Sequence, residues 1–168
     1  MKSKILARKI DRYDLEQVEN FVRESVTLFN ETRGLFRAGQ NILLKPNLLR
    51  AASPEKCVTT HPIVLEATVR VFRDMGMGRI AISDSPSIGS VEHTARCAGY
   101  EYLKEKYDVR IVPFTDPVPL QTEENVPHLK IAGSLQNYDH IINLPKVKSH
   151  QQMTVTLAIK NMFGCVIG

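Results

Sequence analysis

The segment Asn41-Ile42-Leu43-Leu44-Lys45-Pro46-Asn47 carries the pattern from which the fold class follows. Its short apolar run comes after Gly39 and is typical of a strand buried on both faces, as strands of parallel sheets are. A polar loop comes next, and Pro62 stands where the first turn of a helix tolerates proline. The apolar residues beyond it predict a helix that ends near Gly76. The order of strand, loop and helix indicates an α/β unit.

This alternation continues towards the C-terminus. Further strands are predicted at residues 79–83, 109–112 and 140–144, and a helical segment interrupted near Gly99 is predicted at 91–107. Residues 116–135, rich in proline and polar groups, predict a small hairpin-like insertion. The whole pattern predicts a three-layer α/β fold, with a mainly parallel sheet and helices on both faces. No linker or internal repeat is visible, so we expect residues 1–168 to form a single α/β domain.

The N-terminal region predicts one more strand and a long helix. Residues 2–10 alternate weakly and read as a first strand. From Asp14, a candidate N-cap, apolar residues recur at helical spacing as far as Phe29, and Gly34 lies beyond the predicted end.

Composition limits the classes of function. The chain has 168 residues, of which 43% are hydrophobic and 24% charged, enough for a packed core. No apolar run approaches the roughly 20 residues needed to cross a bilayer, and the N-terminus lacks a signal peptide's apolar block. We therefore expect a cytoplasmic protein without a membrane partner. The net charge of +4 is modest and no tryptophan is present, which argues against a nucleic-acid partner.

The three cysteines, Cys57, Cys97 and Cys165, are far apart and form no C-x-x-C pair. The sequence therefore predicts neither a disulfide framework nor an iron-sulfur cluster motif, and the spacing of the histidines predicts no metal site. The cofactor stays unknown at this level.

Polar side chains follow three of the predicted strands. If these strands are neighbours, their carboxyl ends meet at one crevice, where open parallel sheets bind ligands. The candidate catalytic residues there are Lys146, His150 and Asp84. The candidate ligand-binding residues are Lys45, Asn47, Thr59, Thr60, His61, Ser85, Lys148, Lys160 and Asn161.

Each group also has a structural interpretation. Lys45-Pro46-Asn47 has the composition of an exit turn, and Thr59-Thr60-His61-Pro62 that of a helix cap, although free amides at a helix start also bind anions. Lys146 and Lys148 alternate as on an extended segment, which would place both ammonium groups on one side. Lys160 and Asn161 fall in an apolar helical stretch, residues 155–163, where burial requires a partner; Asp84 is a candidate.

Five motifs, in this order over about residues 41–168, resemble the domain of unknown function 362 family. They are Lys45-Pro46-Asn47-Leu48, Thr59-Thr60-His61-Pro62, Asp84-Ser85-Pro86, Leu144-Pro145-Lys146-Val147-Lys148-Ser149-His150 and Thr156-Leu157-Ala158-Ile159-Lys160-Asn161-Met162-Phe163-Gly164. The resemblance implies a three-layer α/β domain, often encoded with or fused to ferredoxin-like segments and described as an iron-sulfur protein. It also implies a further C-terminal half that residues 1–168 do not include.

Two functional hypotheses follow. In the first, the chain is a redox or cofactor-associated protein that binds an anionic small molecule or a metal-bound ligand: the lysines and Asn47 hold negative charge, Asp84 orients them or takes a proton, and His61 or His150 serves as acid, base or metal ligand. In the second, the chain is a noncatalytic assembly module whose lysines pair with an acidic partner such as a ferredoxin-like protein. The apolar residues 162–167 favour oligomerisation, so a homo-oligomer is expected.

Overall fold

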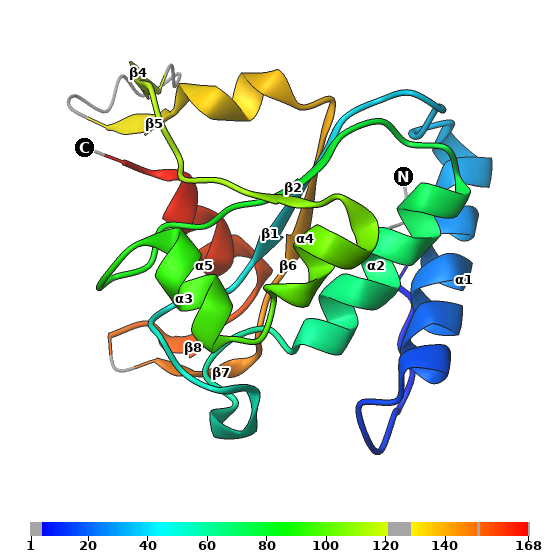
Figure 1. The fold of residues 1–168 in the computed structure, drawn as a ribbon, viewed down its shortest axis with the longest axis horizontal. Coiled ribbons are helices and arrows are strands. Elements are labelled where there is room, and N and C mark those ends of the chain that lie inside the picture. Colours follow the sequence, from blue (N-terminus) through cyan, green and yellow to red (C-terminus); the bar gives the residue numbers. More distant parts are fainter. Residues whose placement is uncertain (1–4, 121–128, 151, 168) are drawn as a thin grey trace.

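A four-stranded parallel sheet forms the centre of the protein in the computed structural model, which describes residues 5–120, 129–150 and 152–167 (Figure 1). The strand order is β3-β2-β1-β6. The strands are β1 (Ile42–Pro46), β2 (Ile80–Ile82), β3 (Arg110–Ile111) and β6 (His140–Leu144). The α/β class with a mainly parallel sheet is thus confirmed.

The order of the strands reverses at β1. From β1 the chain moves outward through β2 to β3, and it then returns to the opposite side of β1 as β6. The register pairs Ile42 with His140 and Pro46 with Leu144, so both strands end at the same level. In open α/β sheets, this kind of reversal opens a crevice beyond the carboxyl ends of the strands.

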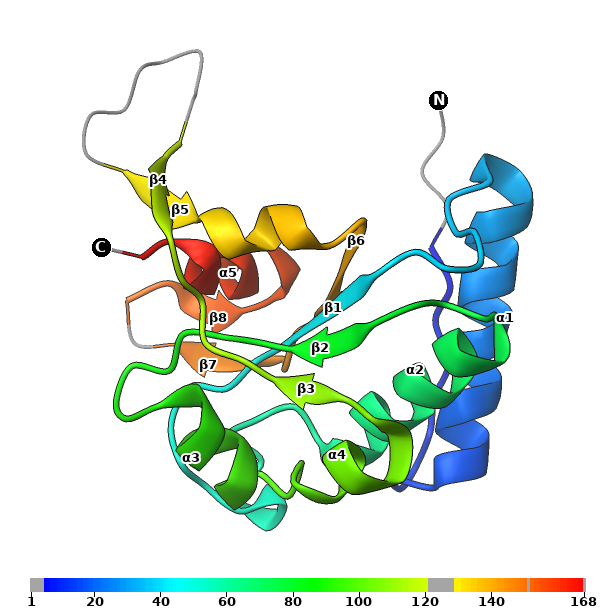
Figure 2. The same cartoon turned by 45° about the horizontal axis from the view of Figure 1, so that its top comes forward.

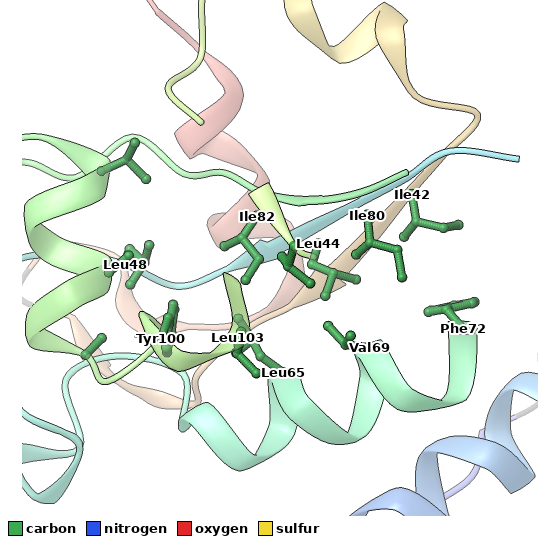
Figure 3. Packing of buried hydrophobic residues seen from close by; sticks show 14 of the residues in the cluster. Ile42, Leu44, Leu48, Leu65, Val69, Phe72, Ile80, Ile82, Tyr100 and Leu103 are labelled. Carbon is green, nitrogen blue, oxygen red and sulfur yellow. The ribbon is translucent and has the colours of Figure 1, made fainter. Parts of the chain in front are cut away.

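Helix α2 (Pro62–Asp74) covers one face of the sheet (Figure 2). Alternate residues of the strands point to this face, and they pack on the apolar side of α2 (Figure 3). Ile42, Leu44, Ile80 and Ile82 are fully buried there against Leu65, Val69 and Phe72. Because strand residues on both faces are buried, the apolar run 42–44 carries no alternation in the sequence.

Further helices surround this core. Helix α1 (Leu15–Arg33) packs on the outer side of α2; Asp14 caps its first turn by accepting a hydrogen bond from Gln17 N, and Gly34 ends it with φ 59°. Helices α3 (Val91–Cys97) and α4 (Tyr102–Tyr107) connect β2 to β3. The interruption expected near Gly99 is therefore confirmed.

The opposite face of the sheet is covered by short elements from the C-terminal half (Figure 2). These are a hairpin of β4 (Pro117–Pro119) and β5 (Lys130–Ala132), the short helix η2 (Gly133–Asn137), a hairpin of β7 (Lys148–His150) and β8 (Thr154–Thr156), helix α5 (Ala158–Met162) and the turn η3 (Phe163–Cys165). The first hairpin confirms the insertion predicted at 116–135, of which residues 121–128 lie outside the described residues. Another short turn, η1 (Pro54–Lys56), lies between β1 and α2.

Two predictions about secondary structure were wrong. The predicted strand at residues 2–10 is not formed over residues 5–10, where Ile5 is 89% exposed and offers no buried face to a sheet; residues 2–4 lie outside the described part. The helix expected over 155–163 begins only at Ala158, because Thr154–Thr156 pairs with Lys148–His150 as β8. Among the described residues, no helix is both long and apolar enough to cross a membrane.

Candidate functional site

A buried ion pair lies at the carboxyl ends of β1 and β2. Lys45 is fully buried, and its Nζ lies 2.5 Å from Asp84 Oδ1. The same carboxylate accepts hydrogen bonds from Leu48 N at 2.6 Å and from Ser85 N at 2.9 Å. Asp84 therefore pairs with Lys45, and the expectation that it would pair with Lys160 was wrong. A buried charge pair of this kind holds together only while both partners are present.

Gly164 closes over this ion pair. A Cβ atom at residue 164 would lie 2.5 Å from Asp84 Oδ1 and 3.0 Å from Lys45 Nζ, so only glycine lets the backbone of η3 approach so closely. The next residue, Cys165, is buried, and this burial raises the pKa of its thiol. Gly164 and Cys165 thus cover the ion pair.

Three asparagine side chains form a hydrogen-bonded row that joins β1, β6 and α5. Asn47 Nδ2 donates to Asn161 Oδ1 at 2.9 Å, Asn161 Nδ2 donates to Asn143 Oδ1 at 2.8 Å, and Asn143 Nδ2 donates to Ala158 O at 2.9 Å. Asn161 is only 3% exposed, and its Nδ2 also approaches the carbonyl oxygens of Lys45 and Pro46. Because the NH₂ group of each asparagine donates to an oxygen atom, the orientation of all three side-chain amides is fixed.

Lys148 lies at the free end of that row. Its Nζ donates to Asn47 Oδ1 and to Val58 O, both at 2.7 Å. Burial is the main cause that lowers the pKa of Lys148 below its ordinary value. The charge of Asp84 acts against this, while three basic neighbours, Lys146, Arg50 and Lys160, lower the pKa further.

A cavity of about 610 Å³ opens above these groups. Its lining includes Asn47, Leu48, Leu49, Arg50, Cys57, Val58, Asp84, Ser85, Ser87, Lys148, Ser149, His150, Gln152, Thr156, Lys160, Asn161, Phe163 and Gly164. The structure therefore brings seven of the predicted site residues to one cavity: Asn47, Asp84, Ser85, Lys148, His150, Lys160 and Asn161. Lys45 lies beneath it, bound to Asp84.

Thr59, Thr60 and His61 lie outside the cavity lining. Thr60 joins the ends of β1 and β6: its Oγ1 accepts from Asn47 N at 2.9 Å and donates to Leu144 O at 2.7 Å. Its carbonyl oxygen accepts from the buried Tyr100 hydroxyl at 2.5 Å. Thr59 is buried beside it, and His61 caps α2 by accepting from Ile63 N at 3.3 Å. The cap of α2 is therefore His61 and not a threonine, while Thr60 joins the ends of the two strands.

Lys146 also lies outside the cavity, away from the contacts of Lys148. Its Nζ donates to the Tyr13 hydroxyl at 2.9 Å, and the Tyr13 ring stacks on His61 with 3.7 Å between centroids. Burial lowers the pKa of His61, and the charge of Lys146 lowers it further. The expectation that both lysines would point to one common site is not met, because Lys148 Nζ contacts Asn47 and Val58 whereas Lys146 Nζ contacts Tyr13.

The remaining candidates sit at the rim. His150 Nδ1 accepts from the backbone amides of Gln152 and Met153, at 3.3 and 3.2 Å, which leaves the proton of a neutral ring on Nε2. Lys160 Nζ lies 5.2 Å from the centre of the Phe163 ring.

Sequence reasoning missed Asn143 and Arg50. Asn143 interrupts the apolar strand 141–144, which was a usable signal, whereas nothing distinguished Arg50 from other loop arginines.

The described residues do not provide a ligand set for an iron-sulfur cluster or another metal centre. Cys57 is exposed, Cys97 is half-buried on α3, and Cys165 is buried at the end of η3. Among the described side chains, no group of three or more His, Cys, Asp and Glu residues is arranged to hold a metal ion.

Comparison with known proteins identifies relatives of this chain. The sequence model of a family described as "Domain of unknown function (DUF362)" matches residues 42–168, a range that begins at β1 and contains the whole cavity lining. The "Thylakoid-associated protein sll1697" of Synechocystis sp. is 37% identical over 132 residues, which is 79% of this chain and 41% of that protein. The chain thus spans less than half the length of that relative. No solved structure shows a significant match.

Proposed function

The chain belongs to the DUF362 family, whose function is unknown, and from its own cavity we propose that it binds an anionic small molecule at the carboxyl ends of β1, β2 and β6. A redox or cofactor-associated role is the finer form of this proposal, and it is supported only by the family resemblance. The binding part is supported by the chemistry of the cavity itself.

The observation that carries the proposal is the charge balance of the cavity. Its lining has three basic side chains, Arg50, Lys148 and Lys160, and a single carboxylate, that of Asp84. Lys45 already pairs with this carboxylate from below, at 2.5 Å. The basic groups of the lining therefore have no negative charge of their own among the cavity residues, and a bound anion would supply it.

The size and the walls of the cavity fit a small organic anion. A volume of about 610 Å³ falls in the range of small-molecule sites, about 300–1,000 Å³. Leu48, Leu49, Val58 and Phe163 add apolar surface to the basic groups. The site also lies at the reversal of strand order, where α/β sheets place their ligands.

Lys148 and Lys146 offer a matched pair of substitutions to test this. We expect Lys148→Met to weaken the binding of inorganic pyrophosphate or citrate, measured by titration calorimetry, by about tenfold to one-hundredfold, since a hydrogen bond to a charged group contributes about 1.5–3 kcal/mol. Lys146→Met changes the net charge equally but lies outside the cavity, so binding should stay within about twofold. Equal losses in both variants, or no binding of either anion by the unmodified chain, would refute the proposal.

A second candidate function, docking of an acidic polypeptide such as a ferredoxin, is favoured by a different observation. Exposed apolar side chains lie beside β7, between β7 and β8, on α5 and on η3, in the same part of the chain as the basic residues Lys148 and Lys160. They include Val147 at 69% exposure, Met153 at 58%, Ile159 at 91% and Phe163 at 61%. An apolar face around a basic centre complements a partner with apolar residues beside carboxylates, and it disfavours a second copy, which would bring like charges together.

Two isoleucines allow this docking to be tested. Ile159 on α5 and Ile5 near the N-terminus are 91% and 89% exposed, so glutamate at either position has nearly the same effect on net charge and solubility. We expect Ile159→Glu to abolish the binding of an acidic plant-type ferredoxin in surface plasmon resonance at low salt, and Ile5→Glu to leave it unchanged. A monomer by light scattering that shows no salt-sensitive ferredoxin binding would eliminate this candidate.

A further inference from the structure

The amine of Lys148 makes two hydrogen bonds to the protein and borders the cavity. Two carbonyl oxygens, Asn47 Oδ1 and Val58 O, each accept one of its hydrogens at 2.7 Å. With two hydrogens bound in this way, an ammonium keeps its third hydrogen for a ligand, and after loss of that proton the amine has a lone pair in its place. Among the described residues no third protein acceptor is bound, and the side chain lines the cavity, so the remaining tetrahedral direction is available to a ligand.

No carboxylate of the cavity keeps this amine charged by direct contact. Asp84, the single acidic side chain in the lining, is bound by Lys45 Nζ, Leu48 N and Ser85 N. Burial lowers the pKa of Lys148, the charge of Asp84 raises it, and the charges of Lys146, Arg50 and Lys160 lower it further, so that this amine loses its proton more easily than an ordinary lysine. Lysines in such surroundings serve as nucleophiles towards carbonyl groups, because the free amine is the reactive species.

The contacts of the amine are also fixed in advance. Asn47 can present its oxygen to Lys148 only because its Nδ2 donates to Asn161 Oδ1, and Asn161 in turn donates to Asn143. Asn161 is 3% exposed and cannot reorient without breaking several hydrogen bonds. The row of asparagines therefore holds the Lys148 nitrogen in one place, which is what a reacting group requires.

We propose that Lys148 forms an imine with an anionic aldehyde or ketone whose acid group is held by Arg50 and Lys160. This rests on the proposed anion site and names its ligand class. The nitrogen lone pair attacks the carbonyl carbon and gives a carbinolamine. The two amine hydrogens then leave with the carbonyl oxygen as water, and a carbon-nitrogen double bond remains. The step needs no oxidant or reductant. If the imine is protonated, its one N–H can still be accepted by Asn47 or Val58.

The test is reductive trapping with a phosphorylated aldehyde, pyridoxal 5′-phosphate, followed by sodium borohydride, intact mass measurement and peptide mapping. We expect one pyridoxyl phosphate per chain, placed on Lys148 and formed at least tenfold faster than on exposed lysines such as Lys9. Inorganic pyrophosphate should slow the labelling. Lys148→Arg should abolish the fast labelling, and Lys146→Arg should retain it. Labelling spread evenly over the lysines, or fast labelling that persists in Lys148→Arg, would overturn the proposal.

Calorimetry with inorganic pyrophosphate on the unmodified chain separates this inference from the proposed function, because it measures anion binding without any imine. If pyrophosphate binds and no aldehyde is trapped at Lys148, the anion site stands and the imine is refuted. If neither occurs, both proposals fail. The mapping on the unmodified chain needs no variant and decides the matter even if Lys148→Arg folds poorly.

Discussion

Asp84→Asn should be among the most destabilising single substitutions in this chain. It removes the carboxylate charge that pairs with Lys45 while it keeps almost the same side-chain volume. Lys45 is 0% exposed and Asp84 5%, so the lysine would be left as an uncompensated charge without access to water. Breaking a buried pair in this way costs about 3–5 kcal/mol. For a chain of this size the loss corresponds to a decrease in Tm of about 6–20 °C.

The measurement is urea unfolding followed by circular dichroism, with thermal unfolding as a second probe. Asp11→Asn is the control, because Asp11 pairs with Lys9 at 2.9 Å while their side chains are 80% and 88% exposed, and an exposed pair of this kind contributes almost nothing. The double variant Lys45→Met with Asp84→Asn should be more stable than Asp84→Asn alone, since no buried charge remains. A cost below about 1 kcal/mol for Asp84→Asn would show that Lys45 is not dependent on this partner.

Three further predictions concern other parts of the chain. Gly164→Ala should destabilise the protein by about 1–3 kcal/mol in urea unfolding, because the new Cβ would meet Asp84 Oδ1 at 2.5 Å. His61→Ala should flatten the pH dependence of Tm just below pH 6.5: burial lowers the folded-state pKa of His61, so protonation disfavours folding, and stability in this window rises with pH. Hydrogen bonds from Lys106, Tyr107 and Tyr102 outweigh the burial of Glu66 and lower the pKa of its carboxyl group. Glu66→Gln should therefore remove stability that is present above pH 4.5 and lost as pH falls. If Tm depends on acid pH in this variant as it does in the unmodified chain, the lowered pKa of Glu66 is contradicted.

Much of the fold was predictable from local patterns, because buried parallel strands and capped helices leave clear signals in a sequence. The run at 42–44 and the proline at the start of α2 are such signals, and both elements form as predicted. The predicted strand at 2–10 failed because alternation in sequence means little without a neighbouring strand to pair with. The boundary between β8 and α5 was missed because pairing with β7 overrides the helical pattern.

The site was predictable as a place but not as a set of roles. Chain order indicated that the ends of three strands would meet, and β2, β1 and β6 are indeed neighbours. Which lysine pairs with Asp84 is decided by the alternation of side chains on β1, which directs Lys45 to the face that α5 and η3 cover. That Lys146 contacts Tyr13 depends on the path of the N-terminal segment, about which residues 145–150 carry no information.

The row of asparagines ties the contacts of Lys148 to the backbone of β1. Asn161 Nδ2 donates to Asn143 Oδ1 and also approaches the carbonyl oxygens of Lys45 and Pro46, which are main-chain acceptors that no side-chain substitution removes. Asn161 Oδ1 accepts from Asn47 Nδ2, and this turns the Asn47 oxygen towards Lys148. The orientation of the Asn47 amide should therefore survive changes at the start of α5, where Asn143 binds the carbonyl of Ala158.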